Sequence, residues 1–203
     1  MSGLLVPLGI GRGDVVAAVG AGGKTTLVYA LAAEARAAGW RVLVTTTTHM
    51  GTLPEATTGP LIVEAEGFRE RDLDDALRAH GRVTILGRRV RPDKLEGLSS
   101  ERVDAWGRVA DLVLVEADGA RGRSLKAPAA HEPVVPASCS LMIVLAALDV
   151  LGTPVAGESV HRAEIVGRLA GLGPEDADTE EALAARLTDA AGWVLVTDAE
   201  RRP

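Results

Sequence analysis

A glycine-rich turn between a buried strand and a helix constrains this 203-residue chain more than any other feature. Residues 14–19 are continuously apolar after Asp14, which is typical of a strand buried on both faces. Gly20-Ala-Gly-Gly23 ends the run, and residues 25–38 then carry apolar side chains at helical spacing. A second buried strand, predicted at residues 41–45, completes a strand–helix–strand unit, which predicts a parallel sheet.

The glycine turn is a short form of a phosphate-binding loop. The standard G-x-x-x-x-G-K-[ST] pattern needs glycine at position 18, where alanine stands, and the form present is G-x-x-G-K-T-T. It keeps glycines that let backbone amides approach phosphate, and a helix N-terminus. Lys24 is expected to contact the β- and γ-phosphates, and the Thr25 hydroxyl to bind Mg²⁺. The expected nucleotide-binding residues are Gly20, Ala21, Gly22, Gly23, Lys24, Thr25 and Thr26.

Two other interpretations of the turn are weaker. A dinucleotide-binding G-x-G-x-x-G motif needs glycine or alanine at position 25 and an acidic residue near the end of the second strand. Threonines occupy both places, at position 25 and at positions 45–48. The other alternative is a plain glycine turn followed by a solvent-exposed lysine.

Two carboxylates follow the strand that is predicted at residues 111–115. Glu116 and Asp118 are two residues apart, so an extended segment directs both to one side. In phosphate-loop proteins a carboxylate at such a strand end holds Mg²⁺ or orients a water. We expect Thr25, Glu116 and Asp118 at the metal, and Lys24, Glu116 and Asp118 in catalysis. The alternative is a polar strand end with an Asp-Gly turn.

Two further segments are candidates for contacting a substrate or client protein. The threonine run at 45–48 ends the second strand, and strand ends line the binding crevice of open α/β sheets. Residues 119–140 form a long, proline-containing loop with a cluster of cations, which suits an anionic ligand. The candidates are Thr48, His49, Arg121, Arg123, Lys126, His131 and Glu132. The alternatives are a threonine-rich strand and a proline-pinned surface loop.

The remaining pattern predicts one α/β domain over residues 1–203. Further strands are expected at 61–63, 83–86, 141–145 and 193–196, and helices at 69–79, 99–108, 161–169 and 179–187. Ser99 or Ser100 is a candidate N-cap. The predicted architecture is a three-layer, open, mainly parallel sheet with helices on both faces, as in phosphate-loop nucleoside triphosphatases.

Composition excludes several other classes of protein. The net charge is −6 and aromatic residues make up 2%, so neither a basic excess nor a stacking platform for nucleic acid is present. Cys139 is the one cysteine, which excludes an internal disulfide framework. The longest apolar run, residues 141–148, is far shorter than the roughly 20 residues of a spanning helix. We therefore expect a cytoplasmic protein without nucleic-acid or membrane partners.

Five stretches of the chain together resemble one family. They are Val-Gly-Ala-Gly-Gly-Lys-Thr-Thr-Leu at 19–27, Val-Thr-Thr-Thr-Thr-His-Met at 44–50, the segment 115–128 with its Glu-Ala-Asp-Gly sequence, His-Glu-Pro-Val-Val-Pro at 131–136, and Val-His-Arg at 160–162. They resemble the YqeC family, the accessory proteins of selenium-dependent molybdenum hydroxylases, and the likeness extends from about residue 11 to 187. The resemblance implies a phosphate-loop fold and a role in maturing the hydroxylase cofactor. Its implied partners are a molybdenum cofactor or selenium intermediate and a client hydroxylase.

Three functions remain open. The first is a Mg-nucleotide-hydrolysing accessory protein, the second a small-molecule kinase or ligase that uses the same loop, and the third a nucleotide-binding scaffold without turnover. As an enzyme the chain would be a nucleoside triphosphatase or phosphotransferase. Members of the family usually continue into an Asn-Lys-x-Asp-like segment, but residues 194–203 contain no lysine. Either the tail is shortened or the guanine-reading motif is missing, so the choice between ATP and GTP stays open.

Overall fold

The computed structural model describes residues 3–64, 68–174, 176 and 193–197. The helix predicted at 179–187 lies outside these residues. The chain divides into two compact units, each assembled from several segments. Unit 1 comprises Met1–Ala17, Thr25–Ala117 and Val134–Leu141, and unit 2 comprises Ala18–Lys24, Asp118–Pro133 and Met142–Pro203. That residues 1–203 form one domain stays a prediction.

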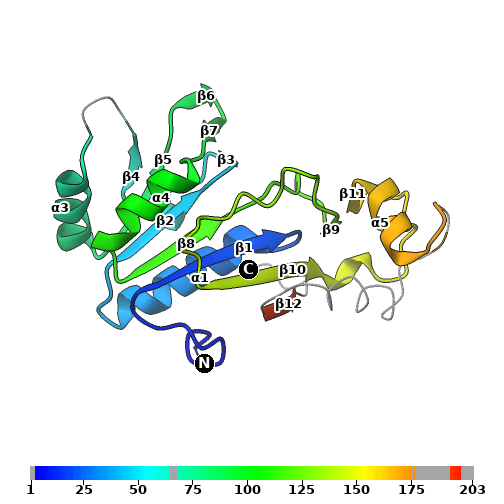
Figure 1. The fold of residues 1–203 in the computed structure, drawn as a ribbon, viewed down its shortest axis with the longest axis horizontal. Coiled ribbons are helices and arrows are strands. Elements are labelled where there is room, and N and C mark those ends of the chain that lie inside the picture. Colours follow the sequence, from blue (N-terminus) through cyan, green and yellow to red (C-terminus); the bar gives the residue numbers. More distant parts are fainter. Residues whose placement is uncertain (1–2, 65–67, 175, 177–192, 198–203) are drawn as a thin grey trace. The chain divides into compact units, whose positions relative to one another are not determined.

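The main sheet confirms the predicted α/β class (Figure 1). Its seven described strands lie in the order β12 (Trp193–Thr197), β10 (Leu141–Ala147), β1 (Asp14–Gly20), β8 (Leu112–Glu116), β2 (Val42–Thr46), β5 (Arg82–Leu86) and β4 (Leu61–Val63). The registered pairs β2–β8, β2–β5, β4–β5 and β10–β12 are parallel. Each predicted strand is present within two residues of its expected bounds, because continuous apolar runs suit strands buried on both faces.

The helices complete a three-layer arrangement with the sheet. α1 spans Lys24–Ala37, α2 Glu55–Thr58, α3 Glu70–His80, α4 Ser100–Trp106 and α5 Ala163–Ala170. α1 buries Leu27, Leu31 and Ala35, which recur at helical spacing. Ser99 is the N-cap of α4, since its hydroxyl accepts a hydrogen bond from the Arg102 amide at 3.2 Å. None of the described helices is long and apolar enough to cross a membrane.

A second, antiparallel sheet in unit 1 was not predicted. β3 (His49–Gly51), β7 (Lys94–Glu96) and β6 (Arg89–Arg91) pair in that order. Its core is a small cluster of Met50, Leu86 and Leu95. Gly97 follows β7 where a Cβ atom would collide with the carbonyl oxygens of Thr46 and Thr48, so glycine permits the close approach.

Unit 2 has a small core of its own, and here one prediction was wrong and one predicted helix begins two residues later than expected. Residues 119–140 were expected to lack regular structure, but Leu125–Lys126 form β9, which pairs in parallel with β11 (Val160–His161). The helix expected from residue 161 begins at Ala163, because residues 160–161 belong to β11. The buried cluster that these strands cover is Leu125, Ala127, Ala146, Val150, Val155, Val160 and Val166.

Candidate functional site

The glycine loop joins β1 to α1, and its three glycines, Gly20, Gly22 and Gly23, all have positive φ values. Gly20 and Gly22 have φ values of +93° and +74°, which side chains rarely adopt. A Cβ atom at Gly20 would also collide with the carbonyl oxygen of Leu145, and one at Gly22 would lie 2.5 Å from the Cβ of Ala147. The loop therefore packs directly against the backbone of β10, and its path is determined by that contact.

Lys24 lies buried inside this loop rather than in solvent. Its ammonium group donates a hydrogen bond to the carbonyl oxygen of Gly20 at 2.6 Å and lies 3.1 Å from Asp118 Oδ1. Only 5% of the side chain is exposed. The alternative of a glycine turn with a solvent-exposed lysine is therefore wrong.

Asp118 connects the glycine loop to the segment that follows β8. Its Oδ2 accepts a hydrogen bond from the Gly20 amide at 2.9 Å and lies 2.9 Å from Lys126 Nζ. Its Oδ1 is buried, and no group among the described residues donates a hydrogen bond to it. Lys24 is close enough, at 3.1 Å, but it makes an ion pair there without hydrogen-bond geometry. Oδ1 therefore keeps an unused acceptor position, which is costly in a buried carboxylate.

In unit 1, Thr25 and Glu116 are in direct contact. The Thr25 hydroxyl donates a hydrogen bond to Glu116 Oε2 at 2.7 Å. Glu116 is the last residue of β8 and is registered with Thr46 of β2, so it stands at the carboxyl end of two parallel strands. Both are oxygen donors of the kind that Mg²⁺ prefers. Within the described residues, no three His, Cys, Asp or Glu side chains gather in a group suited to a metal ion.

The threonine run has structural contacts in unit 1. Thr46 Oγ1 donates to the Glu116 carbonyl oxygen at 2.6 Å and accepts from the Thr48 amide at 3.2 Å. Thr47 Oγ1 donates to the Val134 carbonyl oxygen at 2.6 Å. His49 is exposed in β3, opposite Glu96. The run thus shapes the end of β2, and a substrate role for Thr48 and His49 stays a prediction.

Lys126 is the least exposed of the predicted substrate-loop cations. Its side chain is 1% exposed, and the ammonium group donates to the Gly119 carbonyl oxygen at 2.8 Å and to Glu132 Oε2 at 2.7 Å. Together with Asp118, these oxygens surround the charge. Lys126 therefore binds other parts of its own unit, an arrangement that spacing in the sequence did not reveal.

Glu132 is held by two cations. Arg162 donates from Nη1 to Oε2 at 2.8 Å and from Nη2 to Oε1 at 3.2 Å, a bidentate pair, and Lys126 adds its hydrogen bond. Burial alone would raise the pKa of Glu132, but these hydrogen bonds outweigh it and lower the pKa from 4.5 to about 2. Glu132 is therefore ionised throughout the neutral range and is not a proton donor there.

The other predicted loop residues face solvent to different degrees. His131 and Arg121 are exposed, and Arg123 is half-buried and donates from Nη1 to the Glu158 carbonyl oxygen. The structure therefore unites Asp118, Lys126 and Glu132 in unit 2 and leaves His131 at the surface. The sequence analysis missed His161 and Arg162 as site residues, although Val-His-Arg at 160–162 was among the stretches that carried the resemblance.

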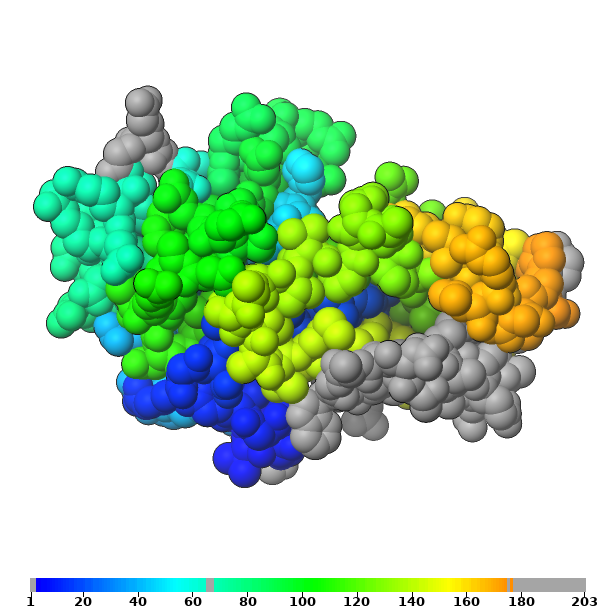
Figure 2. Space-filling view, viewed as in Figure 1, coloured from blue at the N-terminus to red at the C-terminus, as the bar shows by residue number. Residues whose placement is uncertain are grey.

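Unit 1 also contains an open pocket of about 760 Å³ beside α4 and the hairpin of β6 and β7 (Figure 2). Two ion pairs line it: Arg88 with Glu96 at 2.9 Å and Arg102 with Glu64 at 2.6 Å. These two pairs compensate each other's charges, and Glu101 adds one more carboxylate to the lining. None of the nucleotide, metal, catalytic or substrate residues predicted from the sequence lines this pocket.

These features define a three-layer α/β protein with a glycine-rich loop that encloses a buried lysine between its first strand and first helix. The chain belongs to the YqeC family, whose model, described as YqeC protein, matches residues 16–164. It is similar to the Uncharacterized protein YqeC of Escherichia coli (strain K12), with 36% identity over 183 residues, 86% of this chain and 68% of the relative. The resemblance inferred from short motifs is thus confirmed at the level of the family.

Proposed function

We propose that the chain binds a Mg-nucleoside triphosphate at residues 20–26 and hydrolyses it. The observation that carries the proposal is the buried Lys24, held by Gly20 and Asp118 inside a loop whose glycines require their positive φ values. A buried ammonium group next to backbone amides and a helix N-terminus is a site for phosphate.

Lys24, Thr25 and the backbone amides of the loop have separate roles in this proposal. Lys24 turns from the Gly20 carbonyl oxygen to the β- and γ-phosphates, while the amides of 21–24 contact the remaining phosphate oxygens. In unit 1, Thr25 and Glu116 fit Mg²⁺ because both present oxygen atoms. In unit 2, Asp118 Oδ1 is a further candidate ligand because it lacks a hydrogen-bond donor. Mg²⁺, when bound, neutralises charge on the phosphates. Glu116 or Asp118 orients the attacking water.

The biological setting of the proposal rests on the resemblance to the YqeC family. We place the chain in the maturation of selenium-dependent molybdenum hydroxylases, in the cytoplasm, with a molybdenum cofactor or selenium intermediate and a client hydroxylase as partners. The two other candidates use the same loop: phosphoryl transfer to a small molecule, and nucleotide binding without turnover. Phosphate release, a phosphorylated acceptor, or tight binding with no product separates the three.

The test is a thermal-shift panel of ATP, GTP and CTP, each with and without Mg²⁺. A nucleotide at 100 times its Kd stabilises the folded state by about 2.7 kcal/mol, which raises Tm measurably. Lys24→Ala should weaken binding about tenfold or more, because a charge-assisted hydrogen bond contributes about 1.5–3 kcal/mol. Lys94→Ala is the matched control, since Lys94 lies in β7, away from the loop sequence. Equal nucleotide affinity in Lys24→Ala and the control would show that the loop is not the binding site.

A further inference from the structure

Five charged side chains of unit 2 form a row in which positive and negative charges alternate. Lys24 pairs with Asp118 at 3.1 Å, Asp118 with Lys126 at 2.9 Å, Lys126 with Glu132 at 2.7 Å, and Glu132 with Arg162 at 2.8 Å. The row begins and ends with a cation, so these five side chains carry one net positive charge. Their exposed fractions run from 1% for Lys126 to 21% for Arg162. Arg162 is the most exposed member of the row, so a ligand that arrives from solvent reaches the row at this end.

The Arg162 end of this row lies far from the glycine loop in the sequence, and its backbone is strained. Arg162 and Arg121 have φ values of +60° and +52°, and they are the non-glycine residues with positive φ in the described part of the chain. Such conformations are strained for residues with a side chain and persist where surrounding contacts impose them. Arg162 is fixed by Glu132 and by a hydrogen bond to the Ala127 carbonyl oxygen at 3.0 Å.

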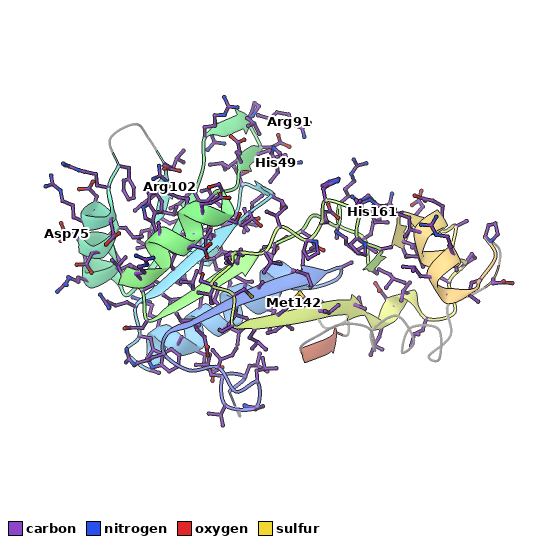
Figure 3. All side chains as sticks on the ribbon, viewed as in Figure 1. His49, Asp75, Arg91, Arg102, Met142 and His161 are labelled. Carbon is purple, nitrogen blue, oxygen red and sulfur yellow. The ribbon has the colours of Figure 1, made fainter. Side chains whose placement is uncertain are left out.

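The pairing of β9 with β11 brings the two arginine-bearing segments together. The amides of Ser124 and Leu125 both donate to the Ser159 carbonyl oxygen, at 2.9 and 3.1 Å. His161 is registered with Lys126, and residues aligned in a parallel pair point to the same side. Figure 3 labels His161 among the side chains around these strands. α5 begins directly after Arg162. The N-terminus of this helix adds a partial positive charge, which Glu164 offsets in part.

The imidazole of His161 reports the local charge. Burial lowers its pKa, and the positive charges of Arg162, Arg121 and Lys126 lower it further, while Glu132 acts in the opposite direction. Three cations against one carboxylate therefore surround a half-buried imidazole. Near His161, the hydrogen-bond donors for a ligand come from arginine and histidine side chains, which suit several oxygens of one anion.

We propose that Arg121, His161 and Arg162 form an anion-binding subsite in unit 2 that takes a phosphate group, either free or as a small-molecule phosphate ester. The subsite does not depend on nucleotide binding at the glycine loop. If the proposed hydrolysis or transfer holds, it is the place for a second, phosphorylated substrate. A tetrahedral oxyanion matches donors from two segments better than a planar carboxylate, because its oxygens point in several directions.

The test follows the histidine imidazole signals of the full chain by NMR during a titration with inorganic phosphate. Phosphate should raise the pKa of His161 by about 1 unit, because an opposite charge placed next to the imidazole favours its protonated form. The exposed His80 is the internal control. Arg121→Ala should weaken the response about tenfold, whereas Arg91→Ala, an exposed arginine of unit 1, should leave it unchanged. Lys24→Ala should retain the response.

Three results would overturn the subsite. The first is an unchanged pKa of His161 at saturating phosphate. The second is an equal change of that pKa with chloride at the same ionic strength, which would show charge screening. The third is loss of the response in Lys24→Ala, which assigns the phosphate to the glycine loop and leaves the proposed nucleotide site intact. A phosphate monoester that binds more tightly than inorganic phosphate identifies an ester as the ligand, and equal affinity identifies free phosphate. Acetate should produce a smaller shift than either, and a larger one would contradict the preference for a tetrahedral oxyanion.

Discussion

Lys126 Nζ lies 2.9 Å from Asp118 Oδ2, and both side chains are almost completely shielded from solvent. Asp118 also accepts a hydrogen bond from the Gly20 amide, so one carboxylate connects the glycine loop with the segment after β8. A change at Lys126 therefore reaches the loop through a single residue. Substitutions can therefore separate residues that act on a ligand from residues that maintain this network.

Glu116→Gln should reduce turnover much more than nucleotide binding. The substitution removes the charge at the proposed metal site, while the amide oxygen can still accept the hydrogen bond from Thr25. We expect kcat to fall by about 100-fold or more and the nucleotide Kd to change by less than about threefold. Single-turnover phosphate release and equilibrium binding measure the two quantities. Parallel losses of binding and turnover would indicate a structural role for Glu116.

Gly22→Ala should disturb the loop more than the same change at Gly152. Both glycines have nearly equal φ values, +74° and +75°, so alanine costs about 1–2 kcal/mol of backbone strain at each. A Cβ atom at Gly22 would lie 2.5 Å from the Cβ of Ala147, whereas nothing lies within 4 Å of one at Gly152. Urea unfolding of both variants isolates the packing contribution. If their stabilities are equal, the contact with β10 does not determine the loop.

Lys126→Met should destabilise the protein because it leaves two carboxylates without their shared partner. Removing one member of a buried ionic network costs about 3–5 kcal/mol. Lys94→Met is the control, with an expected change within about 0.5 kcal/mol. Chemical denaturation gives both values. A Lys126→Met protein as stable as the control would contradict the buried network and would return Lys126 to the group of ligand-binding candidates.

The pKa of Glu132 predicts how stability depends on pH in acid. Its pKa is about 2 in the folded protein and 4.5 ordinarily, so between these values the unfolded state binds the proton more readily. The contribution of Glu132 to the free energy of unfolding is therefore complete above pH 4.5 and decreases as pH falls toward 2. Glu132→Gln should be less stable at pH 7 and should lose this part of the pH dependence. Urea midpoints measured from pH 7 to 2.5 provide the comparison, and parallel curves for both proteins would contradict it.

The local features of this protein were predictable from the sequence. The strand–turn–helix unit at residues 14–38 follows from apolar runs, glycines and helical spacing, which act over a few neighbouring residues. The same holds for the Ser99 cap of α4. The likeness to the YqeC family was also readable, because short motifs such as Glu-Ala-Asp-Gly do not depend on long-range packing.

Contacts between distant segments were decided by the tertiary structure. The sheet of β3, β6 and β7 joins residues more than 40 positions apart, and three-residue strands leave no periodic signal. The sequence by itself determined the glycine loop, the order of its helix and strands, and the charges available around residue 126. Only the folded chain decided that Lys126 is buried between Asp118 and Glu132 and that Arg162 completes the row. The physical reason is that a charged side chain becomes buried only where distant segments supply its partners, and the spacing of residues along a chain does not encode which partners those are.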